Sequence, residues 1–447
     1  MKKEKGVGLV PFLVIVGIIL AVGIAAIALI ITKNNKKPEE TNTNTNPFAN
    51  IIETPTNNTT NETNNNNTTS TVTGGTRYTK DTNIAVGGKV VSIPAGATLS
   101  GIKGEYESVE DGVVIYIIPK TDNIKNWNDD SDGNGIKDVQ EKYDQFVWVP
   151  VEDAIAEDRN SDGKVDATDI KQMIQEKKYP MAIKIEGTND YRAILYDFEL
   201  DEESKEVKVT PKEWSTTLTS YREPAYLTES TKGDSTTYND AGITSASLQE
   251  EFNKMVEKVE KQKGFWVGRY ETSNMKRETE DDKTNQIKVV RGTTNGISNV
   301  NWYRMYAQQK NYSTLAGLAK TSSIIWGSQW DQMMIFMKDV KNINKNNSYY
   351  VVDSIGMGNY GVDASGKEKT EKQIEPTGST DKYKVKNIFD LAGNVYDWTL
   401  EATGTENRVK RGSFYYETTI LSINAQNRNQ DYPIYGQTAI GSRAVLY

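Results

Sequence analysis

The chain has 447 residues with 53 basic and 61 acidic side chains, and it contains neither cysteine nor histidine. These two absences exclude disulfides, thiolate nucleophiles, Cys/His zinc sites and any catalytic site that needs an imidazole. A bound metal would have to use oxygen ligands, which favours calcium or magnesium. The net charge of −8 argues against a protein that binds nucleic acid.

The N-terminal segment predicts a membrane anchor. Residues 7–31 form an apolar run of 25 residues, long enough to cross a bilayer core of ~30 Å. Lysines flank the run on both sides, so the positive-inside rule hardly distinguishes the two orientations. A cleaved signal peptide is the alternative, but its apolar core would be shorter. We therefore expect a single-pass protein of the cell membrane.

The start of the chain also resembles the leader of type IV pilin-like proteins. Residues 1–6 form a short basic leader that ends in Gly6, and in that family the leader is cut after a glycine. The family usually has a glutamate at the fifth position after the cut, where this chain has Pro11. A plain anchor and a filament subunit therefore both stay open.

Residues 32–77 predict a disordered stalk. Between residues 41 and 76, 24 of 36 residues are Asn or Thr, which cannot bury enough apolar surface to fold. A stalk behind an anchor suggests that the remainder of the chain is exposed outside the cell.

The remaining residues predict an α+β domain with many irregular loops. Strands are expected at residues 90–93, 112–118 and 146–151, with Pro150 marking the end of the last strand or a sheet edge. No alternation of strand and helix is present, so a parallel doubly wound sheet is not expected.

Two helices are clear in the sequence. One is expected from about Ser247 to Lys263, with a capping box formed by Ser247 and Glu250, and Gly264 ends it. The other starts near Ser328, with Asp331 at the position that closes its capping box.

Two segments have the spacing of EF-hand calcium loops, with oxygen-bearing side chains at positions 1, 3, 5, 9 and 12 and glycine at position 6. The first loop's predicted ligands are Asp130, Asp132, Asn134, the carbonyl of Ile136, Asp138 and Glu141. The second loop's predicted ligands are Asp158, Asn160, Asp162, the carbonyl of Lys164, Asp166 and Asp169. The second loop continues into an amphipathic helix and resembles one dockerin repeat, inserted at residues 152–178. We interpret both as structural calcium loops, with solvated acidic loops as the alternative.

The C-terminal motifs resemble the formylglycine-generating enzyme family. Residues 387–399 read Asn-Ile-Phe-Asp-Leu-Ala-Gly-Asn-Val-Tyr-Asp-Trp-Thr, and they are followed by Arg-Gly-Ser at 411–413 and Ile-Gly-Ser-Arg at 440–443. Residues 264–271, 300–302 and 326–331 resemble earlier family segments in the expected order. The resemblance covers roughly residues 140–447 and implies a C-type-lectin-like fold.

This resemblance also implies a calcium site and argues against the family's catalysis. The matching calcium ligands are Asp390, Asp397 and the carbonyls of Gly393 and Val395, and a hydrogen-bonded turn without metal is the alternative. Gly393 permits a tight turn, and Trp398 is expected in the core. The family's enzymes use cysteines, and related iron enzymes use histidines, so we expect a non-catalytic binding module.

The last part of the chain is rich in Tyr and Asn, which suit an adaptable recognition surface. The candidate ligand-binding residues are Tyr415, Tyr416, Asn424, Asn427, Asn429, Asp431, Tyr432 and Tyr435. This layout resembles the variable proteins of diversity-generating retroelements, and ordinary loop residues are the alternative.

These observations predict a leader at 1–6, a transmembrane helix at 7–31, a stalk at 32–77, a β segment at 78–140 and the family-like domain at 141–447. The expected function is adhesion or ligand binding at the cell surface, with a protein or glycan as partner, Ca²⁺ as cofactor and no nucleic acid. The alternatives are a minor pilin-like subunit that carries the same head, or an enzyme that uses carboxylates alone.

Overall fold

The computed structural model describes residues 72–212, 221–227 and 242–447, which lie in one compact unit that spans residues 68–447. The predicted leader, transmembrane helix and almost all of the stalk fall outside these residues. Within the described ranges, no helix is both long enough and apolar enough to span a bilayer.

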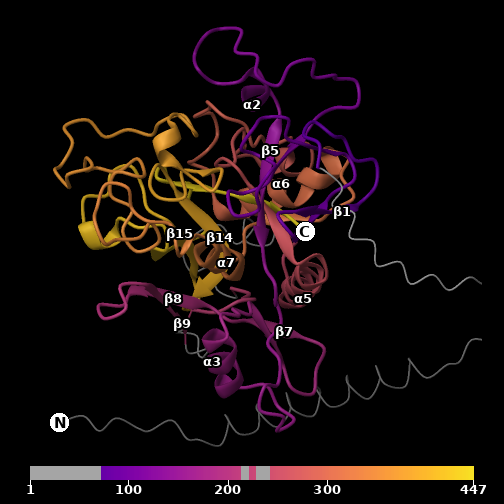
Figure 1. The fold of residues 1–447 in the computed structure, drawn as a ribbon, viewed down its shortest axis with the longest axis vertical. Helices are drawn as coiled ribbons and strands as arrows, with labels where there is room; N and C mark the ends of the chain where they lie inside the picture. The colour runs from indigo at the N-terminus through magenta and orange to yellow at the C-terminus, as the bar shows by residue number, and fades with distance from the viewer. Residues whose placement is uncertain (1–71, 213–220, 228–241) are drawn as a thin grey trace, which may run out of the picture. The chain divides into compact units, whose positions relative to one another are not determined.

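The largest sheet has six strands in the order β11-β18-β10-β5-β4-β3, and all neighbours are antiparallel. One of its two central strands, β5, is labelled in Figure 1. Its strands are β3 (Ala97–Leu99), β4 (Val114–Ile117), β5 (Asp144–Pro150), β10 (Gly264–Gly268), β11 (Ser322–Ile324) and β18 (Ala444–Leu446). Strand β5 ends at Pro150 in the middle of the sheet, so this proline marks a strand end and not a sheet edge. The sheet joins strands from both sides of the domain boundary expected at residue 140.

A second sheet has four strands in the order β16-β15-β14-β17. They are β14 (Tyr396–Thr403), β15 (Asn407–Arg411), β16 (Arg428–Asp431) and β17 (Ile440–Ser442). Strands β14 and β17 run parallel, and the other two pairings are antiparallel. Strand β16 lies at the edge of the sheet, which leaves one side of its backbone without a paired strand.

Four two-stranded hairpins complete the strands of the described residues. They are β1 (Thr82–Val86) with β2 (Lys89–Ile93), β6 (Ala182–Lys184) with β7 (Tyr191–Ala193), β8 (Tyr196–Leu200) with β9 (Val207–Pro211), and β12 (Lys384–Val385) with β13 (Ile388–Phe389). The β1–β2 turn contains Gly87 and Gly88, both with positive φ, as a tight hairpin requires. The arrangement is α+β with predominantly antiparallel strands, as the sequence predicted.

The longest described helix, α5 (Ser245–Gln262), agrees with the helix expected at 247–263, but its cap differs. Thr244 and Ser247 form a reciprocal capping box, three residues before the predicted one. The residues that stop the helix are Lys263, which has a φ of 61°, and Gly264, which begins β10. The apolar side chains on one face of α5, including Phe252 and Val259, are buried.

Helix α7 (Gly327–Met337) begins close to Ser328 as predicted, but Asp331 does not cap it. The side chain of Gln329 accepts a hydrogen bond from the backbone N–H of Trp326 instead. Asp331 is fully buried and pairs with arginines from the four-stranded sheet. The other α-helices in the described part of the chain are α2 (Asp138–Lys142), α3 (Ala167–Gln175) and α6 (Trp302–Leu315). Short 3₁₀ turns lie at Thr279–Lys283, Asp381–Tyr383 and Ile420–Ser422.

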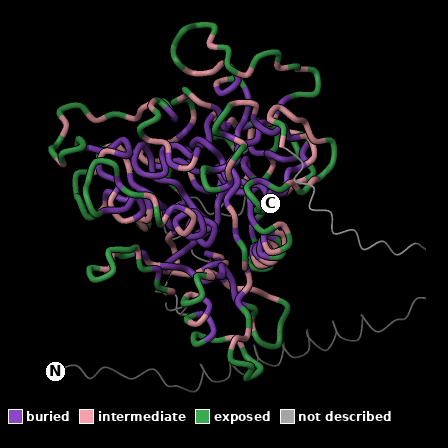
Figure 2. Tube along the Cα trace, viewed as in Figure 1, coloured by how far each residue is buried: buried purple, intermediate pink, exposed green. Residues whose placement is uncertain are grey.

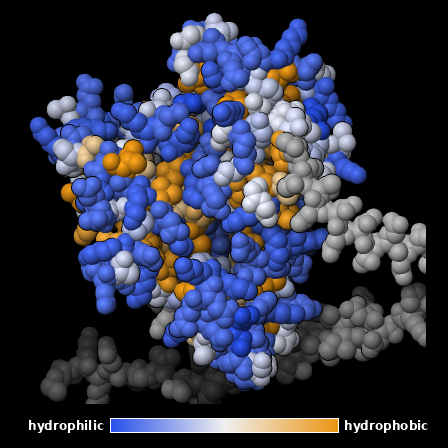
Figure 3. All heavy atoms as spheres, in the orientation of Figure 1, coloured by the Kyte–Doolittle hydropathy of each residue, from blue (hydrophilic) through white to orange (hydrophobic). Residues whose placement is uncertain are grey.

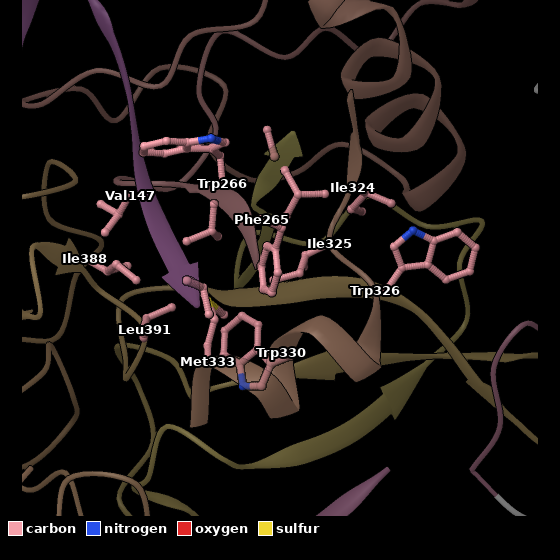
Figure 4. Close-up of a cluster of buried hydrophobic side chains, with 14 of the residues drawn as sticks. Val147, Phe265, Trp266, Ile324, Ile325, Trp326, Trp330, Met333, Ile388 and Leu391 are labelled. Carbon is pink, nitrogen blue, oxygen red and sulfur yellow. The ribbon is translucent and has the colours of Figure 1, made fainter. Parts of the chain in front are cut away.

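The core lies between the six-stranded sheet, α7 and the segment before β14 (Figure 4). Phe265 of β10 points toward Ile325, Met333 and Trp330 (Figure 4). Trp266 projects from the opposite face of the sheet, where its ring centroid lies 5.1 Å from that of Trp148. Burial is continuous through the centre of the unit, while exposed residues gather in the outer loops, including the loop before α2 (Figure 2). Most of the face drawn in Figure 3 is hydrophilic, with apolar atoms confined to separate patches.

Candidate calcium loops and ligand-binding surface

The first predicted calcium loop, residues 130–141, has the backbone geometry of a ligand-binding loop. Asp130 at position 1 accepts a hydrogen bond from the N–H of Gly135 at position 6, at 3.0 Å. The side-chain oxygens of Asp132 and Asn134 accept from the N–H groups two residues later, at 3.1 and 2.7 Å. Gly135 has a φ of 85°, which explains the requirement for glycine at this position.

The second predicted loop, residues 158–169, repeats the same bonds. Asp158 accepts from the N–H of Gly163 at 2.9 Å, and Asn160 and Asp162 each accept from the N–H two residues later at 2.9 Å. Gly163 has a φ of 87°. Two segments with different sequences therefore fold into the same loop, in which the first three ligand side chains are fixed by backbone N–H groups.

The last ligand positions differ between the loops. Glu141 accepts a hydrogen bond from the side-chain amide of Asn134, at 3.1 Å, and so faces back into its loop. Asp169 accepts from the N–H groups of Asp166, Arg159 and Asn160, and these bonds lower the pKa of its carboxyl. Asp169 also lies in the first turn of α3, the amphipathic helix expected after this loop, and the side chains of Ile170 and Met173 on it are buried.

The donor set of these loops fits a hard cation, although the acids are spread apart. Carboxylate, amide and carbonyl oxygens are the ligands that calcium prefers. Oδ1 of Asp130 is buried and has no hydrogen-bond partner in the structure. Among the described residues, no three acidic side chains converge closely enough to hold a metal by themselves. Calcium here would therefore also need carbonyl oxygens, such as those of Ile136 and Lys164.

Residues 387–399, which contain the calcium ligands predicted from the family resemblance, lie in a buried cluster of charged side chains. Asp397 accepts a hydrogen bond from Nε of Arg443 at 3.2 Å, and Arg443 also donates to the backbone oxygen of Asp390 at 3.3 Å. The carboxylate of Asp390 turns away and accepts from the N–H of Gly378 at 2.7 Å. The structure thus brings both predicted acids to one arginine, but their carboxylates have different partners.

A third carboxylate in this cluster, Glu271, was not among the predicted ligands. It accepts hydrogen bonds from Asn394 at 2.6 Å and from the N–H of Val395 at 3.2 Å. Burial, Asp390 and Asp397 raise the pKa of Glu271 well above its ordinary value. Burial also raises the pKa of Asp390 to about 6. The signal in the sequence was the Arg-Tyr-Glu at 269–271, which belongs to a segment that resembles the family but was not considered as a ligand position.

Three buried carboxylates with one guanidinium form an environment that a cation would stabilise, because isolated buried charges are costly. Oδ1 of Asp397 is buried without a hydrogen-bond partner in the structure, so it has an acceptor position to offer. Gly393 has a φ of 97° and lies against the backbone of Asn359, which confirms the tight turn. Trp398 is fully buried, as expected.

The predicted ligand-binding residues lie before β16, along it and directly after it. Phe414 stacks on Tyr396 with ring centroids 5.1 Å apart, and Tyr415 and Tyr416 continue this row edge to face. The ammonium group of Lys372 lies 4.4 Å from the centre of the Tyr416 ring. Burial raises the pKa of the Tyr396 hydroxyl, and its hydrogen bond with Asn429 on β16 opposes that rise. The aromatic row and the edge strand therefore adjoin.

Beside the predicted Tyr416, this region carries two exposed apolar side chains that were not predicted from the sequence. Tyr416, Ile420 and Leu421 are 56%, 50% and 90% exposed. Together with Tyr415 and Asn429 they form what we call the C-terminal surface. Ile420 and Leu421 were overlooked because the prediction considered only Tyr and polar residues.

The other predicted ligand residues have structural partners. Asn424 is buried and donates to the carbonyl of Leu421, and Asn427 donates to that of Ser422. Asp431 pairs with Lys410 at 2.9 Å. Tyr432 is partly buried, and Tyr435 is 49% exposed on the turn after β16.

A network of buried ion pairs holds the edge strand of the C-terminal surface to the core. Asp331 of α7 pairs with Arg411 at 2.7 Å and with Arg428 at 2.9 Å, and Glu401 pairs with the same two arginines at 3.3 and 2.9 Å. Arg428 belongs to β16, so the network fixes this edge strand to the core. Sequence reasoning missed it because the partners are far apart in the chain.

Glu223 lies beside this network at the start of α7. It accepts hydrogen bonds from the N–H groups of Gly327 and Ser328 at 2.7 and 2.9 Å. Burial and the neighbouring Glu401 raise the pKa of Glu223 to about 8. Both glutamates are nearly inaccessible to solvent, so in this conformation neither can reach a substrate.

Comparison with known proteins gives limited matches. No protein-family model matches the chain, and no curated protein matches it. PvdO from Pseudomonas aeruginosa is similar over 41% of this chain and 81% of its own, with 14% identity and a TM-score of 0.29. Treponema denticola variable protein 1 is similar over 41% and 84%, with 15% identity and a TM-score of 0.28. The structure of CarF is similar over 41% and 86%, with 12% identity and a TM-score of 0.28.

Proposed function

We propose that this chain is a non-catalytic ligand-binding protein of the cell surface, with a C-type-lectin-like head that recognises a protein or glycan through the C-terminal surface. The observation that carries the proposal is the concentration of exposed apolar side chains. Of the seven large hydrophobic residues that are exposed in the described part of the chain, three belong to the C-terminal surface, namely Tyr416, Ile420 and Leu421. Clustered exposed apolar residues mark interaction sites more often than isolated ones do.

The arrangement of this surface supports recognition. Tyr416 and Leu421 offer large apolar contacts, and Asn429 offers an adaptable polar group on an edge strand. Rigid aromatic anchors beside adaptable polar residues are typical of binding surfaces. The buried pairing of Arg428 with Asp331 holds the edge strand in place, so little ordering is needed on binding.

The remaining parts of the proposal rest on the sequence. The apolar run at 7–31 would anchor the chain in the membrane, and the Asn/Thr-rich segment would hold the head outside the cell. The resemblance of 387–399 and its companion motifs to the formylglycine-generating enzyme family supports the C-type-lectin-like head. The lack of Cys and His supports a binding role over the catalysis of that family.

Calcium is proposed as a structural ligand of the head. The matching hydrogen bonds in loops 130–141 and 158–169, and the buried acceptor atoms on Asp130 and Asp397, support this. Thermal unfolding of the full chain with calcium or with EGTA tests it. We expect a higher Tm with calcium, and identical curves would refute the calcium part while leaving ligand binding open.

An array of defined glycans and purified extracellular protein domains tests the binding function. The full chain, purified in detergent, is applied as wild type, as the double variant Tyr416→Ser/Leu421→Ser, and as the matched control Val90→Ser, which changes an apolar residue that is 47% exposed on β2. We expect selective binding by the wild type and the control, and loss in the double variant. Absence of binding, or equal binding by all three, would refute the proposal.

A further inference from the structure

A second candidate site lies away from the C-terminal surface, in a cavity of about 580 Å³. The end of β4, the start of β5, residues 286–288 and the C-terminal end of α6 surround it. This volume is within the range of small-molecule sites, ~300–1,000 Å³. Ile117, Ile118 and Leu315 give the cavity apolar walls, so a ligand would contact both carbon and polar groups.

The lining of this cavity carries a net positive charge, whereas the chain as a whole is acidic. Four basic side chains reach it from separate segments, namely Arg77, Lys120, Lys142 and Lys288. The acidic lining residues are Asp122 and Asp144, which leaves an excess of two positive charges in a chain of net charge −8. The carbonyl end of α6 contributes only about half a negative charge, too little to cancel this excess.

The two acids are already occupied. Asp122 accepts hydrogen bonds from the hydroxyl of Tyr143 at 2.8 Å and pairs with Lys142 at 3.0 Å. Asp144 is buried and accepts from the N–H of Val289 at 2.7 Å and from the hydroxyl of Tyr312 at 2.9 Å. Burial raises the pKa of the Asp144 carboxyl and the nearby charge of Lys288 opposes that rise, so Asp144 balances part of the Lys288 charge. Arg77 and Lys120 have no such acidic neighbour among the described residues that line the cavity.

The remaining cations have few partners. Arg77 is partly buried and donates to the carbonyl of Pro119 at 3.3 Å. Lys288 is also partly buried, and its backbone bonds with Ser273 hold it beside the cavity. Neither side chain, nor that of Lys120, forms an ion pair with the described residues. A guanidinium and two ammonium groups around one cavity are a common arrangement for binding phosphate and carboxylate groups.

We propose that this cavity binds a small anionic ligand that carries at least two negative charges on phosphate or carboxylate groups, held by Arg77, Lys288 and Lys120. The site is independent of the proposed recognition surface, because none of the residues of the C-terminal surface line it.

Calorimetric titration of the full chain with inorganic phosphate and, separately, with citrate tests this proposal. The two anions distinguish a phosphate-specific site from a carboxylate-specific one. The test variant is Arg77→Gln/Lys288→Gln. The control is Lys171→Gln/Lys184→Gln, which removes the same two charges from exposed positions on α3 and β6. Thermal unfolding of each variant shows whether it is folded.

We expect at least one anion to bind the wild type and the control with similar affinity, and at least tenfold weaker binding by a folded test variant. Equal weakening in test and control variants would show that only the overall charge matters, and would overturn the proposal. Absence of binding by both anions would also overturn it. If the test variant does not fold, Lys120→Gln, which changes an exposed position, replaces it. This variant is expected to bind the anion at least threefold more weakly than the wild type. Unchanged binding would contradict the proposed site.

Discussion

Glu223 is expected to make the head less stable as the pH rises. Its carboxyl has an ordinary pKa of 4.5, which burial and Glu401 raise to about 8 in the folded chain. The folded state therefore holds this proton more tightly than the unfolded state does. The contribution of this proton to the stability of the folded state is complete below pH 4.5. It is lost progressively as the pH rises towards 8. Each pH unit within this window costs about 1.4 kcal/mol, so the step from pH 5 to pH 7 costs roughly 3 kcal/mol.

The variant Glu223→Gln isolates this effect, because glutamine has the shape of a protonated glutamate and cannot ionise. Its side-chain oxygen can still accept from Gly327 or Ser328 at the start of α7. Other buried acids, such as Asp390, titrate in both proteins, so the difference between the two unfolding curves reports Glu223 alone. The exposed residue Glu203 provides the control variant, Glu203→Gln.

Urea unfolding, followed by tryptophan fluorescence at pH 5, 6, 7 and 8, is the assay. We expect Glu223→Gln to gain stability relative to the wild type by about 1 kcal/mol or more per pH unit over this range. Glu203→Gln should follow the wild type. A constant difference between Glu223→Gln and the wild type at all four pH values would show that Glu223 is ionised when folded, and would refute the reasoning.

Three further predictions concern stability. Arg411→Met leaves Asp331 and Glu401 buried with one arginine fewer, so urea unfolding should show a free energy of unfolding lower by roughly 3–5 kcal/mol. A loss below about 1 kcal/mol would contradict the network. Gly393→Ala should lower the free energy of unfolding by more than about 1 kcal/mol, because the φ of 97° is unfavourable for alanine and a Cβ would lie 2.4 Å from the carbonyl oxygen of Asn359. Unchanged stability would argue against this turn. With calcium at 100 times its Kd, the wild type should gain about 2.7 kcal/mol, and Asp158→Ala should gain less; equal gains would exclude the second loop as a site.

Local patterns allowed much of the fold to be predicted. The calcium-type loops were predicted with their glycines, because the loop bonds join residues only two to five positions apart. Helices α5 and α7 were predicted from local start signals near Ser247 and Ser328, and both begin within two residues of those positions. Helix α6 was missed since it is buried on most sides, including Arg304 and Gln308, and so lacks a clear polar face.

Interactions between distant segments could not be predicted. The capping role assigned to Asp331 was wrong because Arg411 and Arg428, 80 and 97 positions away, bind its carboxylate. Similarly, Glu271 joins Asp390 only through tertiary packing. The C-terminal surface was predicted in part, from composition, but its most exposed member, Leu421, became apparent only from solvent exposure.

The central claim is that the C-terminal surface contacts the ligand. Photo-crosslinking tests it most directly, with p-benzoylphenylalanine placed at Leu421 or, as the control, at Val90 in the full chain. Each protein is irradiated with a ligand that the array identifies. The account predicts a covalent adduct from position 421 and none from position 90. An adduct from position 90 alone, or none from position 421 while the ligand stays bound, would contradict it.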